Sequence, residues 1–111
     1  MSTLIESSTA EVREVCEKSG RAVNFIRFTS VFEIAEEIFT VRLEAFEPDL
    51  NVISCLQANV FLDDNDNGRR EIDVFGIYSK ERGTREEFAR DFFASAVEWA
   101  EEMEEEVNKF S

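Results

Sequence analysis

Alternating apolar and polar positions in the middle of the chain predict two strands. Between Ile38 and Ala45 the period is two, with one face formed by Phe39, Val41, Leu43 and Ala45. Glu47-Pro48-Asp49 then ends the strand, because proline has no N–H to donate to a neighbour. A second alternating run covers Leu50 to Leu62. It places Val52, Leu56, Val60 and Leu62 on one face and Ile53, Cys55 and Phe61 on the other.

The segment after these runs predicts a hairpin and a returning strand. Asn65-Asp66-Asn67-Gly68 is typical of a two-residue turn, because Asn and Gly tolerate positive φ angles. The returning strand, from about Arg70 to Ser79, shows Ile72, Val74 and Tyr78 on one side and Phe75 and Ile77 on the other. We therefore expect an antiparallel meander.

The last part of the chain has the period of an amphipathic helix. Thr84 is placed to cap it, and Glu86 and Glu87 lie in the first turn, where the helix dipole favours negative charge. Apolar residues then recur at intervals of three and four, at Phe88, Phe92, Ser95/Ala96, Trp99, Met103, Val107 and Phe110. This stripe predicts one long helix packed on the sheet.

The start of the chain predicts a short helix. Ser7-Ser8-Thr9 followed by Glu11 fits a capping box, so we expect a helix from about Thr9 to Ser19 that stops at Gly20. The stretch from Arg21 to Thr29 could continue this helix or form an edge strand, and we favour a short strand. The predicted fold class is α+β: a short N-terminal helix, an antiparallel meander of three to four strands, and a long C-terminal amphipathic helix on the sheet, in a single domain over residues 1–111.

The predicted strands carry more apolar side chains than one covered face needs. Ile53, Cys55, Phe61, Phe75 and Ile77 alternate onto the side opposite to Val52, Leu56, Val60 and Val74. Either the N-terminal helix covers this second face, or part of it is a homodimer interface. The candidate interface residues are Ile53, Phe61, Phe75 and Ile77.

Composition narrows the classes of function. The chain has 25 acidic and 12 basic residues and no histidine, which gives a net charge of -13. Such a protein is repelled by nucleic acids and anionic lipids, so we expect a basic protein surface as its partner, with no direct nucleic-acid binding and no membrane. Without histidine the chain lacks the commonest general base and metal ligand. We therefore expect no enzyme activity, no catalytic residue and no cofactor. No signal peptide or membrane span is apparent, which favours the cytoplasm.

Two further features have weaker interpretations. In that compartment Cys16 and Cys55 are expected to be buried free thiols. The run from Asp63 to Gly68 matches the first half of a calcium-binding loop, but Val74 occupies the position that requires a bidentate Glu. An acidic hairpin tip is the better interpretation, and we predict no metal site.

The negative charge is concentrated in the last quarter of the chain. Residues 1–30 have equal numbers of acids and bases, whereas residues 84–111 have nine acids and three bases. Glu98, Glu101, Glu102 and Glu105 follow the i, i+3, i+4, i+7 spacing of one helix face, next to Glu106. The face could simply keep the chain solvated, or it could dock on a basic partner. Further candidate partner-binding acids are Glu36, Glu37, Glu44, Glu47 and Asp49, together with Asp63, Asp64 and Asp66 of the hairpin tip.

The order of motifs over about half the chain resembles a known group of proteins. Ala58-Asn59-Val60-Phe61-Leu62-Asp63-Asp64, then Ile72-Asp73-Val74-Phe75-Gly76-Ile77-Tyr78, then Gly83-Thr84-Arg85-Glu86-Glu87-Phe88 is similar to the second half of proteins in the YbjN and type III secretion chaperone-like group. The resemblance covers roughly residues 47–103. It implies a small, acidic, non-enzymatic α+β protein that forms homodimers and binds a partner chain, and it identifies no site residue.

Two functional hypotheses follow from these features. The first is a non-enzymatic inhibitor or regulator that mimics nucleic acid in a basic groove, as phage-encoded anti-restriction and anti-CRISPR proteins do. The alternative is a dimeric chaperone or adaptor of the type III secretion chaperone-like kind, which the apolar surplus and the resemblance favour.

Overall fold

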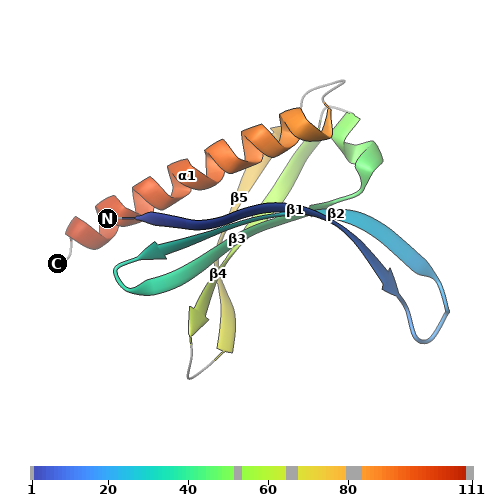
Figure 1. The fold of residues 1–111 in the computed structure, drawn as a ribbon, viewed down its shortest axis with the longest axis horizontal. Coiled ribbons are helices and arrows are strands. Elements are labelled where there is room, and N and C mark those ends of the chain that lie inside the picture. The colour runs from blue at the N-terminus through green and yellow to red at the C-terminus, as the bar shows by residue number, and fades with distance from the viewer. Residues whose placement is uncertain (1, 52–53, 65–67, 80–83, 110–111) are drawn as a thin grey trace.

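The chain forms a five-stranded antiparallel sheet with one long helix packed on it. The computed structural model describes residues 2–51, 54–64, 68–79 and 84–109. The elements are β1 (Thr3–Val15), β2 (Ala22–Ile34), β3 (Glu37–Ala45), a 3-10 helix η1 (Glu47–Asn51), β4 (Ser54–Asp64), β5 (Gly68–Ser79) and α1 (Arg85–Lys109). Neighbouring strands follow chain order, β1-β2-β3-β4-β5 (Figure 1). The α+β class and the meander are confirmed, with five strands in place of three or four.

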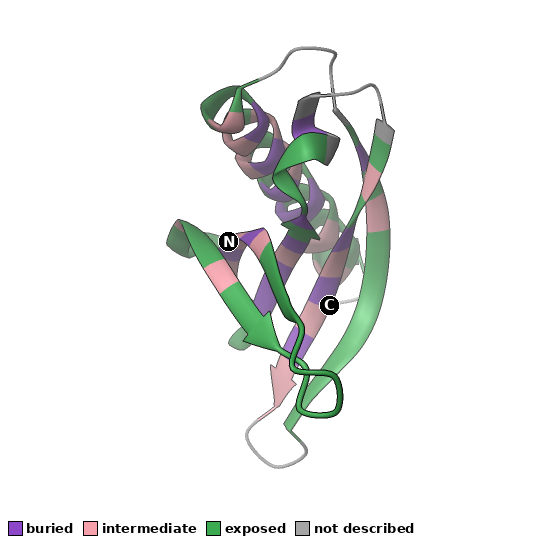
Figure 2. Cartoon of the chain, turned by 90° about the vertical axis from the view of Figure 1, so that its right-hand side faces the viewer, coloured by how far each residue is buried: buried purple, intermediate pink, exposed green. Residues whose placement is uncertain are grey.

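The hydrophobic core lies between α1 and one face of the sheet. The expected apolar stripe is buried there at Phe88, Phe92, Ala96 and Trp99, while Met103 and Val107 are half-buried and Phe110 lies outside the described residues. Phe28 of β2 packs against the helix, with its ring centroid 5.2 Å from that of Phe88 and 5.8 Å from that of Phe92. Buried residues are concentrated on the facing surfaces of α1 and the sheet (Figure 2).

Strand β3 and the start of α1 confirm the sequence predictions most closely. The alternating residues Phe39, Val41, Leu43 and Ala45 are buried beneath the helix. At the helix start, the Glu87 N–H donates a hydrogen bond to Thr84 Oγ1 at 3.1 Å, which is the predicted cap. The strand ends at Ala45, just before η1, which contains Pro48. Leu50 belongs to η1 and not to the following strand, which begins at Ser54.

The predicted N-terminal helix is wrong, because this segment forms β1 and the tip of a hairpin. From Thr9 to Val15 each residue pairs with β2, and Val12 lies opposite Phe25. Gly20 adopts the left-handed conformation expected for it, with a φ of 71°, but it closes the hairpin turn by donating to the Cys16 carbonyl. β-branched side chains recur along the strand at Thr3, Ile5, Thr9, Val12 and Val15.

Strand β2 is longer and more central than predicted. The expected short edge strand from Arg21 to Thr29 is part of the 13-residue strand β2, which lies between β1 and β3. Its turn into β3 contains only Ala35 and Glu36, whose φ angles are 52° and 67°. Positive φ at both central residues is the pattern of a type I′ hairpin turn, usually supplied by Asn and Gly. Neither residue signals this turn in the sequence.

A bulge between β4 and β5 reverses the predicted faces of β5. Phe61 lies opposite Glu71, but the adjacent Val60 lies opposite Asp73, so β5 contains one extra residue at this point. Because side chains alternate with a period of two, every later residue of β5 changes face. Phe75 and Ile77 therefore face the helix, and Val74 lies on the opposite face. The predicted turn at residues 65–67 lies outside the described residues.

The sheet face away from α1 is not covered by a second helical layer within the described ranges. The N-terminal segment forms β1 and not the predicted helix, so it does not cover this face as expected. The structure also contains no helix, in the ranges it describes, that is long and apolar enough to cross a membrane.

Candidate functional site

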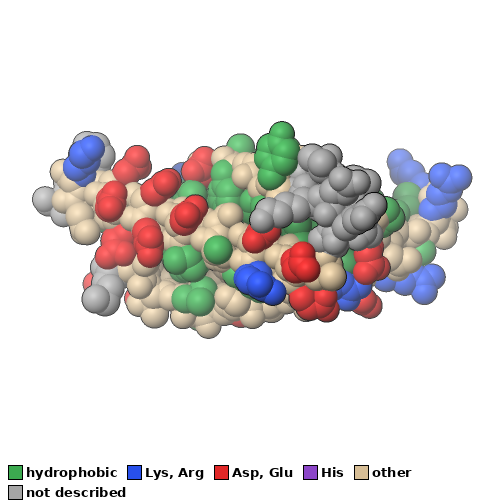
Figure 3. Space-filling model, turned by 90° about the horizontal axis from the view of Figure 1, so that it is seen from above, with side chains coloured by type: hydrophobic (Ala, Val, Ile, Leu, Met, Phe, Trp, Pro, Cys, Tyr) green, Lys and Arg blue, Asp and Glu red, His purple; other side chains and the backbone are tan. Residues whose placement is uncertain are grey.

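The outward side of α1 carries the exposed carboxylates that the sequence pattern predicted. We call them the acidic helix face, consisting of Glu98, Glu101, Glu102, Glu105 and Glu106, all of which are exposed. They point away from the sheet because Ala96, Trp99 and Ala100 occupy the inward side. Acidic side chains are grouped over the C-terminal half of α1 (Figure 3).

The electrostatics of this face are unfavourable for the isolated helix. The four glutamates at i, i+3, i+4 and i+7 repel one another, at about 0.2–0.5 kcal/mol per neighbouring pair. They also lie toward the C-terminus of α1, where the helix dipole is negative. None of the ion pairs found among the described residues involves the acidic helix face. This arrangement does not increase the stability of the helix.

Glu104 differs from its neighbours because it contacts the start of β1. Its Oε2 accepts a hydrogen bond of 2.9 Å from the Ser2 backbone N–H. This bond, and to a lesser extent the Ser2 hydroxyl, lowers the pKa of Glu104. Glu104 therefore connects β1 to α1.

The second group of predicted acids is only partly brought together. Glu36, Glu37, Asp63 and Asp64 line a hollow of about 540 Å³ at the β2–β3 turn, with Arg70. Asp63 accepts a hydrogen bond of 2.9 Å from Thr40 Oγ1 and pairs with Arg69 Nε at 2.6 Å. Asp66 lies outside the described residues. In the part of the chain that the structure describes, no group of three or more acidic or cysteine side chains is placed to hold a metal ion.

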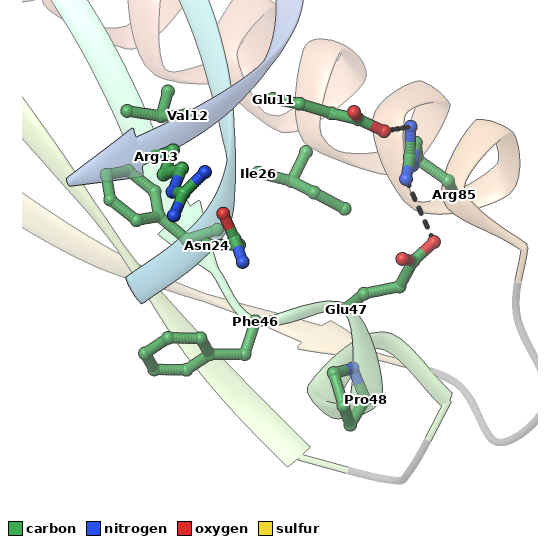
Figure 4. A pocket seen from close by; sticks show the side chains of 10 residues that line it. Glu11, Val12, Arg13, Asn24, Ile26, Phe46, Glu47, Pro48 and Arg85 are labelled. Atoms are coloured by element: carbon green, nitrogen blue, oxygen red, sulfur yellow. Dashed lines mark hydrogen bonds and ion pairs between the residues drawn. The ribbon is translucent and has the colours of Figure 1, made fainter. Parts of the chain in front are cut away.

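Glu44 and Glu47 lie apart from that group. Glu44 is on the face opposite α1, where it pairs with Arg27 at 3.0 Å and Arg42 at 3.7 Å. Glu47 accepts a hydrogen bond from Arg85, which also binds Glu11 (Figure 4). The hydrogen bond to Glu11, and then the smaller effect of the hydrogen bond to Glu47, raise the pKa of Arg85. Glu44 and Glu47 thus each pair with an arginine of this chain. The side chain of Asp49 lies outside the described part of the structure.

The residues proposed for a homodimer interface do not form one surface. Phe61 lies on the face away from α1, partly covered by the guanidinium groups of Arg42 and Arg69 at 4.8 and 5.7 Å from its ring centroid. Phe75 packs against the core and Ile77 is only 4% exposed, so neither is available to a partner. Ile53 lies outside the described residues.

The prediction of buried thiols is wrong, because both cysteines are free and exposed. Cys16 lies at the β1–β2 hairpin tip, and Cys55 lies opposite Tyr78 on the face away from α1. Hydrogen bonds from the Ser19 side chain and backbone, and then from the Lys18 backbone, lower the pKa of Cys16.

Sequence reasoning missed a cavity of about 620 Å³ beside η1. It lies between the end of the β1–β2 hairpin and the segment from Phe46 to Pro48, and Asn24 and Phe25 of β2 line it (Figure 4). No sequence motif marks it, because its walls come from four separate segments: residues 11–13, 24–26 and 46–48, and Arg85. The pairing of Arg85 with Glu11 and Glu47 closes one end.

Comparisons with protein-family models, with curated proteins and with solved structures found no match to this chain.

Proposed function

We propose that this protein is a non-enzymatic binding protein that docks the acidic helix face on a basic surface of a partner protein. The observation that carries this proposal is the exposure of five carboxylates on one rigid helix, where they repel one another and take part in none of the ion pairs found in the described ranges. Repulsion among these carboxylates lowers the stability of the helix, and the described residues form no ion pair with them. A basic surface of a partner protein would supply the missing ion pairs.

The spacing of the charges favours a basic groove that ordinarily holds nucleic acid. From Glu98 to Glu106 the helix rises about 12 Å, because each residue adds about 1.5 Å. The interval contains six glutamates when Glu104 is included, or roughly one charge per 2 Å, close to about one per 1.7 Å along duplex DNA. An inhibitor of the anti-CRISPR or anti-restriction type would use such a surface to exclude nucleic acid from its target. Carboxylates fixed on a packed helix lose little conformational entropy on docking.

The experiment compares two variants of equal net charge. Partners are captured from the native host with the unmodified protein, and the affinity of each purified partner is then measured at low and high salt. Replacing Glu98, Glu101, Glu102 and Glu105 by Gln should weaken binding strongly and reduce its salt dependence. The control replaces Glu6, Glu14, Glu17 and Glu33, exposed residues of the β1–β2 hairpin, by Gln.

Three outcomes decide the proposal. Loss of affinity in the helix variant alone supports a specific docking surface. Unchanged affinity in that variant, or an equal loss in the control, contradicts it, because general acidity would then explain binding. The mimic version also requires the unmodified protein to displace labelled duplex DNA or RNA from its partner.

The uncovered sheet face supports a second candidate function, a dimeric chaperone or adaptor. Tyr78 is 70% exposed and Val74 is also exposed there. Light scattering should then detect a dimer, and Phe61→Glu should dissociate it while urea unfolding still shows a folded protein. A protein that is monomeric at high micromolar concentration would argue against this candidate.

A further inference from the structure

Strand β2 extends beyond the end of its neighbour β3. The last pair between them joins Ile26 to Ala45, whereas β2 continues to Ala22 in its pairing with β1. The chain leaves the sheet after Ala45 because Pro48, in the first turn of η1, cannot donate to a strand. The segment Ala22–Phe25, which we call the open edge, therefore has a strand on one side only.

Backbone groups of the open edge point toward the empty side. The Cys16 N–H donates to the Arg21 carbonyl at 2.8 Å, so the Arg21 backbone faces β1. In an antiparallel ladder successive residues direct their N–H and C=O groups to alternate sides. The backbone groups of Ala22 and Asn24 consequently face away from β1, toward the position that β3 would occupy if it continued.

Both apolar and charged side chains line this position. The cavity of about 620 Å³ lies along the open edge, and an adjoining hollow of about 320 Å³ has Val23, Phe25 and Phe46 in its wall. Phe46 is 51% exposed although it is a large aromatic residue. Five of the ten residues that line the cavity are apolar and five are polar or charged, and ligand sites combine both kinds of side chain.

The open edge also lacks the charges that usually protect a sheet edge. Along the outer strand β1, charged residues occur at Glu6, Glu11, Arg13 and Glu14, and charges on an edge oppose pairing with another chain. Residues 22 to 25 are Ala, Val, Asn and Phe. Charged side chains thus protect the outer strand β1, whereas the open edge can pair with another chain.

We propose that the open edge binds a short extended segment of a partner protein, which adds to β2 as a strand where β3 has ended. The edge of four residues accommodates about 13 Å of extended chain. The backbone groups of Ala22 and Asn24 hydrogen-bond the segment, and an apolar side chain of the segment fits between Phe25 and Phe46. The segment contains alternating apolar and polar residues and no acidic ones, since the protein carries a charge of -13. This surface is separate from the acidic helix face.

The test begins with a displayed library of random heptapeptides selected on the full-length protein. Enriched sequences should show alternating apolar residues without Asp or Glu. A synthetic copy of the most enriched peptide should increase the hydrogen-exchange protection of the Ala22 and Asn24 amides. N-methylation of alternate peptide amides should then weaken binding about tenfold or more in one set of positions and little in the other, because only one set faces β2.

Two matched variants separate the groove from general hydrophobicity. Phe46→Ser should weaken the enriched peptide about tenfold, which is the loss of about 1.4 kcal/mol expected when one apolar contact is removed. Tyr78→Ser removes another highly exposed aromatic side chain, on β5, and should leave the affinity unchanged. Exchange protection of the core strands confirms that both variants fold.

Several results would overturn the proposal. The library could enrich no peptide, or the enriched peptide could protect only amides of β1 or β5. The two sets of N-methylated peptides could weaken binding equally, or Phe46→Ser could bind the peptide with unchanged affinity. Protection of Ala22 and Asn24 in the absence of peptide, together with a dimer in solution, would show that a second copy of this chain occupies the edge instead.

Discussion

The hydroxyl of Ser30 is the clearest local defect in the core. The side chain is 0% exposed in the centre of β2, and its Oγ has no hydrogen-bond partner among the described residues. A buried hydroxyl without a partner costs about 1–3 kcal/mol. We expect Ser30→Ala to raise the free energy of unfolding by about 1 kcal/mol, as measured by urea denaturation.

Thr40 provides the matched control for this prediction. It is also buried in the sheet, but its hydroxyl donates to Asp63. Thr40→Val should therefore lower the free energy of unfolding by about 1 kcal/mol, opposite in sign to Ser30→Ala. If Ser30→Ala is destabilising, the Ser30 hydroxyl has a partner in solution, such as a buried water.

Cys16 should be reactive because Ser19 stabilises its thiolate. The hydrogen bonds of Ser19 lower the pKa of Cys16, so more thiolate is present at any pH below the ordinary value. In a Cys55→Ala background, iodoacetamide should modify Cys16 faster at pH 7 than it does after Ser19→Ala. The pH profile of the rate should move to higher pH in that variant. Superimposable profiles would show that Ser19 has no such effect.

Individual side-chain faces were predictable only while the strand register was regular. The alternation within β5 is as the sequence indicates, since Phe75 and Ile77 share one face. The bulge beside Ile72 then exchanges the two faces relative to β4. No residue in the sequence marks that bulge, so Phe75 and Ile77 lie on the side opposite to the one that regular alternation predicts.

At the scale of elements, predictability follows burial. α1 and β3 each bury one face, so their apolar residues recur with periods of 3.6 and 2, which identify a helix and a strand. β1 contains no fully buried residue among Thr3–Val15, so its sequence has no such period. Its strand conformation depends on pairing with β2, which is a non-local interaction, and the local signal at Ser7–Glu11 favoured a helix instead.

A hydrogen bond connects α1 to the last strand, β5. Trp99 Nε1 donates to Asp73 Oδ2 at 3.0 Å, and the bulge is what turns Asp73 toward the helix. We expect Asp73→Ala to lower the free energy of unfolding by about 1–2 kcal/mol, because the buried indole N–H loses its acceptor. Asp73→Asn retains an acceptor oxygen and should lose less than half as much. Equal losses in urea denaturation would show that the charge matters more than the hydrogen bond.

At the scale of the whole molecule, the negative charge is unevenly placed along its length. On the face seen in Figure 3, acidic groups gather over the C-terminal half of α1, while basic groups are visible at the opposite end, where the β1–β2 hairpin projects; that hairpin also carries Glu14 and Glu17. The sequence indicated a neutral start and an acidic end, but not that the two would lie at opposite extremes of an elongated molecule 48 Å long. That arrangement depends on the hairpin, which the sequence did not predict.

Salt should therefore affect folding and binding in opposite directions. A net charge of -13 repels itself in the folded state, and 0.3 M NaCl screens this repulsion. The urea midpoint should rise between 20 mM and 300 mM NaCl without a change in m-value, whereas partner affinity should fall over the same range. Replacing Glu98, Glu101, Glu102 and Glu105 by Gln reduces the net charge to -9, so both salt effects should diminish together. A urea midpoint that falls with salt would mean that ion pairs, such as those of Arg85 with Glu11 and Glu47, outweigh the charge repulsion. Repulsion within the acidic helix face would then not lower the stability of the folded protein.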